Sequence, residues 1–163
     1  MQRAPHRDRL REYMAIRRRI EVRGLMPACV LRVAGSTDKV KRFLRQSRIE
    51  PDKVYWRGEL GFLKSRGVNK ISGFNISLSG SHGESIEKQA KQATAFIRKY
   101  REEMELIKAL GFRQVSVDFG LYDLATENRP WPSYHLPSSF VQLVGEFGFD
   151  VELSFYGSSS PAP

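Results

Sequence analysis

A long amphipathic stripe in the second half of the chain constrains the fold most. Apolar residues recur there at alternating steps of four and three positions, which is the spacing of one helix face: Ile86, Ala90, Ala93, Ile97, Tyr100, Met104 and Ile107. The spacing predicts one helix over about residues 83–110, closed by Gly111. Because the chain offers no matching second stripe for a coiled coil, we expect this helix to pack on a sheet.

Segments with the patterns of strands lie on both sides of this helix. Two shorter helices are also predicted, one capped by residues 36–38 and one running from Pro137 to Gly148. The predicted order is strand, helix, strand, strand, long helix, strand, short helix and strand, with the strands at residues 28–34, 54–57, 71–78, 115–119 and 149–156.

The order of elements predicts an α+β fold. Its first six elements follow the ferredoxin-like split β-α-β sandwich, to which a helix and a strand are added. We expect a mostly antiparallel sheet with helices on one face. The other face would look into solvent or at a partner, and its polar residues are Asn75, Ser77, Ser116, Asp118, Asp150 and Glu152.

The 163 residues suit a single core, so one domain is expected. We predict a basic arm at residues 1–25, flexible or partly helical, a single α+β domain at residues 26–157 and a flexible tail at residues 158–163. Much of the net charge of +9 belongs to the arm, which holds eight arginines against three acidic residues. An alternative is that the arm precedes a start at Met26.

Composition excludes several classes of protein. No stretch approaches the ~20 apolar residues of a membrane-spanning helix, so no membrane partner is expected. The single cysteine, Cys29, forms neither an internal disulfide nor a four-cysteine zinc site, which favours a reducing compartment and predicts the cytoplasm. Residues 17–19, all arginine, interrupt the only candidate apolar segment of a secretory signal.

No catalytic residue, cofactor or metal is predicted. The loop at residues 78–85 has two glycines before a helix, a context in which backbone N–H groups bind phosphate, but it lacks the Walker A lysine. Ser81 and Glu84 have the spacing of a helix-capping box, which we favour over an enzyme site at Ser81–Gly83. The three histidines have no carboxylate pair at ligand spacing: His6, His82 and His135.

Two aromatic clusters are candidates for binding. Trp56 and Arg57 follow a short strand, and a second tryptophan lies in a loop stiffened by prolines. The structural alternatives are a core-edge position for Trp56 and a lid over the sheet edge for Trp131. The predicted binding residues are Trp56, Arg57, Arg129, Trp131, Tyr134 and His135.

The segment Glu50-Pro-Asp-Lys-Val-Tyr-Trp-Arg-Gly-Glu59 resembles a signature of the bacterial family known as domain of unknown function 4279. The ending from Leu136-Pro137 through a short helix to residues 151–156 also looks like that family's closing helix and strand. The resemblance covers about residues 28–157 and implies a small bacterial stand-alone domain without catalytic residues. By analogy with such domains, it suggests an immunity or interaction protein.

We therefore expect a non-enzymatic domain that binds another protein, with an immunity-type inhibitor as one form of it. Its surface would be the polar sheet face or the Trp131 loop. The alternative is a nucleic-acid-binding protein that uses the arm, with Arg17, Arg18 and Arg19 as phosphate contacts and Trp56 or Trp131 for stacking.

Overall fold

The structure is a computed structural model that describes residues 29–61, 67–80, 85–121 and 133–155. The elements in these ranges follow the order β1 (Cys29–Gly35), α2 (Thr37–Gln46), β2 (Lys53–Tyr55), β3 (Ser72–Ser77), α3 (Ile86–Lys99), α4 (Arg101–Leu110), β4 (Gln114–Leu121), α5 (Ser138–Phe147) and β5 (Asp150–Phe155). The order of strands and helices agrees with the sequence prediction except at the long helix.

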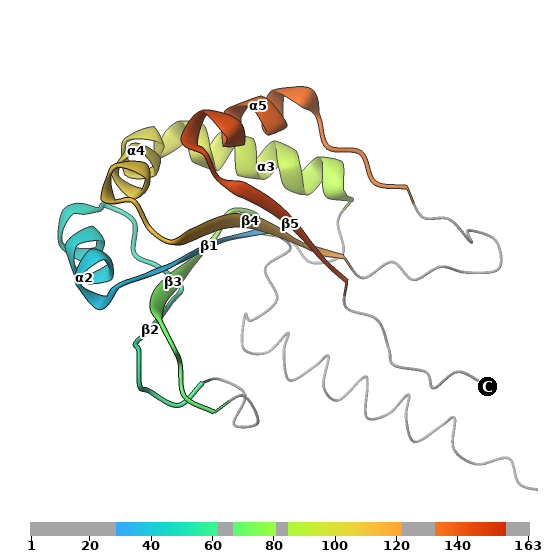
Figure 1. The fold of residues 1–163 in the computed structure, drawn as a ribbon. Helices are drawn as coiled ribbons and strands as arrows, with labels where there is room; N and C mark the ends of the chain where they lie inside the picture. The colour runs from blue at the N-terminus through green and yellow to red at the C-terminus, as the bar shows by residue number, and fades with distance from the viewer. Residues whose placement is uncertain (1–28, 62–66, 81–84, 122–132, 156–163) are drawn as a thin grey trace, which may run out of the picture.

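The strands form one sheet in the order β2-β3-β1-β4-β5. Three neighbouring pairs are antiparallel, and only β4 and β5 run parallel. Each of the first two helical connections joins parallel strands that are separated by a third strand, as in the split β-α-β sandwich. The predicted α+β fold is confirmed, and α5 with β5 is the added pair (Figure 1).

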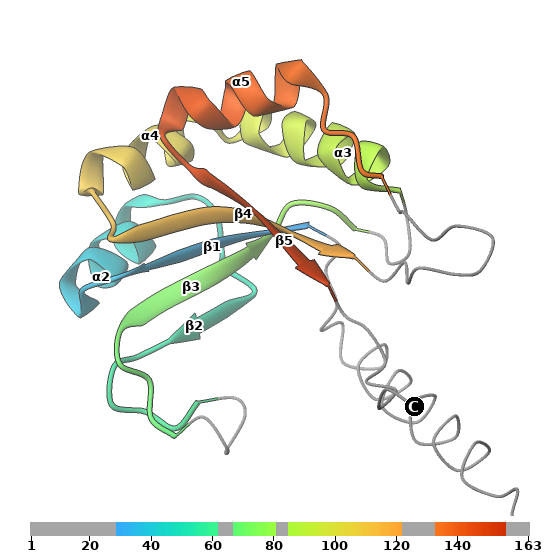
Figure 2. The same ribbon diagram turned by 45° about the vertical axis from the view of Figure 1, so that its right-hand side comes forward.

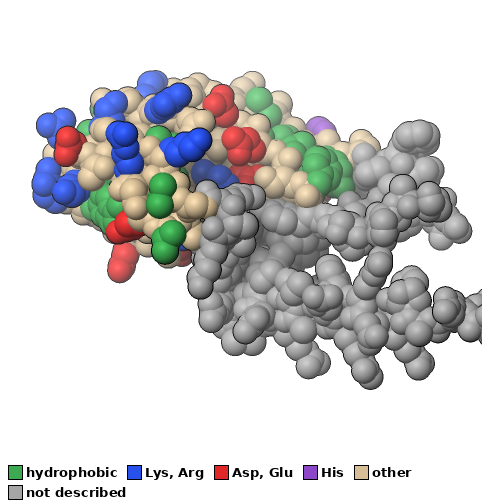
Figure 3. All heavy atoms as spheres, turned by 60° about the horizontal axis from the view of Figure 1, so that its bottom comes forward, with side chains coloured by type: hydrophobic (Ala, Val, Ile, Leu, Met, Phe, Trp, Pro, Cys, Tyr) green, Lys and Arg blue, Asp and Glu red, His purple; other side chains and the backbone are tan. Residues whose placement is uncertain are grey.

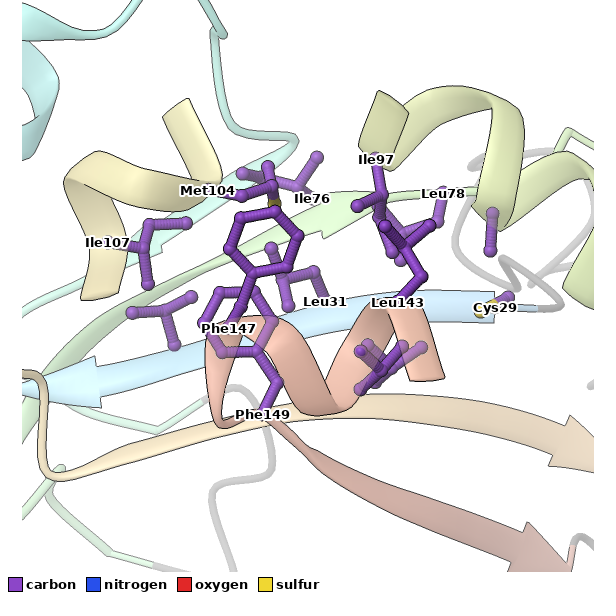
Figure 4. Packing of buried hydrophobic residues seen from close by; sticks show 14 of the residues in the cluster. Cys29, Leu31, Ile76, Leu78, Ile97, Met104, Ile107, Leu143, Phe147 and Phe149 are labelled. Atoms are coloured by element: carbon purple, nitrogen blue, oxygen red, sulfur yellow. The ribbon is translucent and has the colours of Figure 1, made fainter. Parts of the chain in front are cut away.

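The central strands bury alternate residues against the helices. Leu31 of β1 faces Ile76 of β3 and Val117 of β4 across the register, and all three side chains are buried. Helix residues complete this layer (Figure 4), among them Ile97, Met104, Ile107, Leu143 and Phe147. Removing this apolar area from water supplies most of the stability of such a fold.

The first helix begins where the sequence predicts. The Ser36 hydroxyl accepts a hydrogen bond from the Lys39 N–H at 3.4 Å, and so caps α2. Val40 and Phe43 are buried, and the Phe43 ring stacks on that of Phe74 with centroids 4.4 Å apart. The stack anchors α2 on β3.

The single long helix predicted for residues 83–110 is wrong. Tyr100 leaves the helical conformation, with φ −110° and ψ 37°, and separates α3 from α4. After the break α4 packs against α2 and α5, and Ile97 and Met104 are both buried. The start also differs, because Ser85 caps α3 through the Lys88 N–H, while Ser81 and Glu84 lie outside the described residues.

The last two elements follow the prediction closely. Pro137 precedes α5, and Gly148, in the left-handed conformation at φ 70°, ends it and turns the chain into β5. Throughout the described ranges, no helix is both long and apolar enough to cross a membrane.

Candidate functional site

The outer edge of the sheet at β5 is the feature that stands out from the rest of the fold. β5 pairs with β4 along its whole length, from Asp150 opposite Ser116 to Phe155 opposite Leu121. On its other side β5 has no neighbouring strand among the described residues, as Figure 2 shows. Its backbone N–H and C=O groups on that side are therefore available to a further strand.

The apolar side chains of β5 are exposed, although they point to the helix side of the sheet. Val117 and Phe119, their neighbours in β4, are completely buried. By contrast, Val151 is 36% exposed, Leu153 41% and Phe155 62%. The helix layer therefore stops short of the edge strand and leaves an apolar row uncovered.

Helix α5 extends this row with an uncharged flank. Arg101 and Lys108 of α4 bind Glu146, the first to its carboxylate at 2.9 Å and the second to its carbonyl at 2.7 Å. Val141 precedes Glu146 by five residues, or about 140° around a helix, so it lies on the flank away from α4. Val141 is 48% exposed. Gly145 lies on the same flank, and a Cβ atom added there would meet no atom within 4 Å.

We call this surface the β5 edge, and define it as Val141, Val151, Leu153 and Phe155. These four are among six large hydrophobic side chains that are exposed in the part of the chain that the structure describes. The other two, Leu60 and Val68, face each other in an isolated β-bridge elsewhere. Apolar side chains are thus concentrated at one edge, which is typical of an interaction surface.

Tyr134 and His135 are the predicted binding residues that lie beside the β5 edge. The Tyr134 ring packs edge-on against Phe155, with centroids 5.9 Å apart, and also contacts the core. His135 is exposed. In Figure 3 it is the purple side chain, since the other two histidines lie outside the described residues, and hydrophobic side chains gather next to it.

Trp56 and Arg57 lie at the opposite edge of the sheet, after β2. Four strand spacings, or about 19 Å, separate that edge from β5. Trp56 is partly buried against the core, which agrees with its structural alternative, and its backbone N–H donates to Glu59 Oε2 at 3.2 Å. The exposed Arg57 is held by its backbone, whose N–H donates to Ser72 Oγ at 3.0 Å. The predicted binding residues therefore do not form one site.

Several predicted residues lie outside the described ranges. They are Arg129 and Trp131 of the proline-stiffened loop, Ser81–Gly83 of the glycine loop, and Arg17, Arg18 and Arg19 of the arm. Their roles stay predictions.

The polar face of the sheet is less open than the sequence suggests. Ser116 and Asp118 were expected to face solvent or a partner, but they are 7% and 2% exposed. Asp118 Oδ2 accepts a hydrogen bond from Arg32 Nε at 2.7 Å, and this ion pair offsets part of the cost of burying the carboxylate, whose Oδ1 has no hydrogen-bond partner among the described residues. Asp150 and Glu152 of β5 are exposed on this face, as predicted.

Tyr55 covers another part of the polar face. Its hydroxyl and ring lie directly over Gly73, where a side chain would collide with them. Burial raises the pKa of Tyr55, and the charge of Arg32 partly opposes that rise. This face therefore carries a tyrosine and an ion pair that are used within the fold.

A shallow hollow of about 260 Å³ lies between α2 and α4. The Arg48 guanidinium binds there to Glu103 Oε1 at 2.7 Å and to Glu102 Oε2 at 2.8 Å. The hydrogen bond from Arg48 lowers the pKa of the nearly buried Glu103 carboxyl, and the same pair raises the pKa of Arg48. The charges in the hollow pair with one another, so these residues link the end of α2 to α4 within the fold.

Metal ligands are not grouped in the described ranges, where no three His, Cys, Asp or Glu side chains come together. The thiol of Cys29 is buried, and burial followed by the charge of Asp118 raises its pKa. Burial and the raised pKa both disfavour the thiolate form.

Comparison of the chain with protein-family models, with curated proteins and with solved structures finds no match. The resemblance to the family of domain of unknown function 4279 stays a prediction.

Sequence reasoning missed the β5 edge because the alternation of apolar and polar residues along β5 predicts an apolar and a polar face of the strand, but not whether a helix covers the apolar face. One signal could have revealed it. Among the residues of α5 only Glu146 is charged, whereas a surface helix usually carries several charges on its outer face.

Proposed function

We propose that the chain is a protein-binding domain and that the β5 edge is its binding surface. The observation that carries the proposal is that, among the residues the structure describes, the strand edge without a neighbour coincides with four of the six exposed large hydrophobic side chains. Exposed long edges promote unwanted pairing, and proteins usually protect them with charged side chains, above all lysine, with proline or with a bulge. The charges of β5, on Asp150 and Glu152, lie only on its polar face, and β5 contains no lysine or proline, so its apolar face supports a surface that a partner covers.

Such an edge binds by strand addition. A partner strand would form main-chain hydrogen bonds with β5, while Val151, Leu153 and Phe155 select apolar side chains at alternate positions. Asp150 and Glu152, on the other face, favour a partner with basic or uncharged residues there. An immunity-type inhibitor that binds a target protein is one form of this function. The buried free thiol of Cys29 suits the reducing cytoplasm as its location.

Selection from a library of random peptides tests the proposal. We expect the wild-type chain to enrich peptides with alternating apolar and polar residues. Binding should be lost in Leu153→Arg and kept in Leu60→Arg, which changes an exposed leucine in the isolated bridge. Enrichment of no peptide by a chain that is monomeric at the concentration used, or of peptides that bind Leu153→Arg equally well, would contradict the proposal.

A second candidate function is nucleic-acid binding, which the eight arginines of residues 1–25 and the net charge of +9 favour. Within the described residues, exposed basic side chains also gather on α2, at the end of the molecule away from His135 (Figure 3), namely Lys41, Arg42 and Arg45. Arginine–phosphate contacts release counterions, so this binding would depend steeply on salt.

A further inference from the structure

We infer that the partner of the β5 edge is a second copy of this chain. The two copies would pair β5 with β5 antiparallel about a twofold axis and form one continuous ten-stranded sheet. The inference rests on the proposed function and goes further, since it names the partner and the register.

The alternation within β5 makes this strand complementary to itself. Its apolar residues all lie on the helix side of the sheet, and Asp150, Glu152 and Ser154 lie on the other side. A twofold axis perpendicular to the sheet keeps the helix layers of both copies on the same side. Apolar residues then meet apolar residues, and polar residues meet polar ones.

Charge selects the register. A pairing centred on Glu152 would place this carboxylate against its own copy, and one centred on Val151 would place Asp150 against Glu152. Like charges directly opposite each other destabilise a sheet. A pairing centred on Leu153 avoids both, because Glu152 then faces Ser154, and it pairs residues 151–155 of β5, whereas one centred on Ser154 would pair only residues 153–155. We therefore assign the register in which Leu153 meets Leu153 and Val151 meets Phe155.

The helix layer fits the same arrangement. Val141 lies on the flank of α5 away from α4, and Gly145 and Ser138 share this flank. These residues are uncharged, and Gly145 leaves open space beside its backbone. The α5 helices of two copies can therefore approach each other above the paired strands and cover the apolar row of β5.

The opposite edge of the sheet explains why the assembly would stop at two copies. β2 has only three residues, and Pro51 precedes it while Lys53 begins it. Short length, proline and lysine all oppose pairing of an edge strand. Each copy thus has one edge that accepts a strand, and a twofold contact uses it on both copies.

Sedimentation equilibrium of the full chain measures the dimer directly. We expect a mass of twice 18.7 kDa at micromolar concentration. Leu153→Arg places two cations at the centre of the interface and should raise the dimer dissociation constant by about a hundredfold or more. Leu60→Arg adds the same charge outside the β5 edge and should leave the constant unchanged.

Substitutions of Ser154, a half-buried polar residue of β5, test the register of the β5–β5 pairing. Ser154→Glu should raise the dimer dissociation constant by about threefold to tenfold, because it faces Glu152 of the second copy, and Ser154→Lys should lower it by a similar factor. Oxidation of Leu153→Cys should cross-link two chains, whereas Val151→Cys alone should not. The buried Cys29 does not interfere. Circular dichroism checks that each variant is folded.

The outcomes separate the two proposals. A wild-type chain that stays monomeric but selects alternating peptides through Leu153 overturns the second copy as partner and leaves the binding function standing. A dimer that tolerates Leu153→Arg, or that responds alike to both charges at residue 154, overturns the inferred interface. A monomer that selects no peptide overturns both proposals.

Discussion

Substitution of Gly73 by alanine tests the arrangement of β1, β2 and β3. Gly73 lies between Tyr55 of β2 and Ala34 of β1 in the register. A Cβ atom at Gly73 would lie 2.3 Å from Tyr55 Oη and 2.3 Å from the carbonyl oxygen of Val33. Contacts of Cβ atoms below 3.0 Å are essentially never observed, so both neighbours must move by at least about 0.7 Å.

The two neighbours differ in how easily they move. The Tyr55 ring can rotate away and give up its packing on the sheet, but the Val33 carbonyl belongs to the backbone of the central strand. Overpacking of this kind costs about 3 kcal/mol. For a chain of 163 residues, such a loss lowers the midpoint of thermal unfolding by about 10 °C.

Urea and thermal unfolding, followed by circular dichroism, measure this cost. Gly80→Ala is the matched control, because a Cβ atom there meets nothing within 4 Å, and its stability should stay within about 0.5 kcal/mol of the wild type. The double variant Gly73→Ala with Tyr55→Ala should lose less stability than the two single changes together. If Gly73→Ala were as stable as Gly80→Ala, the placement of Tyr55 and Val33 would be refuted.

Two further predictions concern charge. Glu103→Gln should lower the free energy of unfolding by about 1 kcal/mol at neutral pH, because it weakens the hydrogen bond with Arg48, whereas Glu102→Gln at an exposed position should have no effect. The pKa of Glu103 in the folded chain lies below its ordinary value of 4.5, so the extra stability of the wild type over Glu103→Gln exists above pH 4.5 and disappears as the pH falls through the folded pKa. Urea titrations of both chains across this range would contradict the prediction if the difference in their free energies of unfolding stayed constant. Titration of the full chain with a random oligonucleotide at two salt concentrations should show affinity falling steeply with salt if residues 1–25 bind phosphate, and salt-insensitive binding would exclude the arm as its source.

Local patterns predicted most of the fold. Alternation located the strands, and Ser36 and Gly148 marked helix ends because capping depends on neighbouring residues only. The strand and helix order then pointed to the observed sheet, since few topologies accommodate it.

The departures from prediction have long-range causes. The break at Tyr100 goes with the packing of α4 against α2 and α5, and the buried Asp118 pairs with Arg32, a residue 86 positions away. The exposure of Leu153 depends on where the helix layer ends. No local pattern carries these facts, which is why the binding candidates chosen from aromatic composition, Trp56 and Tyr134, turned out to lie at opposite edges.

Amide hydrogen exchange at increasing protein concentration tests the role of the β5 edge most directly. An unpaired edge strand exchanges quickly, because half of its N–H groups face solvent, and a paired strand is protected. We predict that amides of β5 gain protection as the concentration rises, while those of β2 at the other edge keep their rates. Exchange in β5 that is fast and independent of concentration, or protection that grows at β2 instead, would contradict the assignment of the β5 edge as the surface where two copies meet.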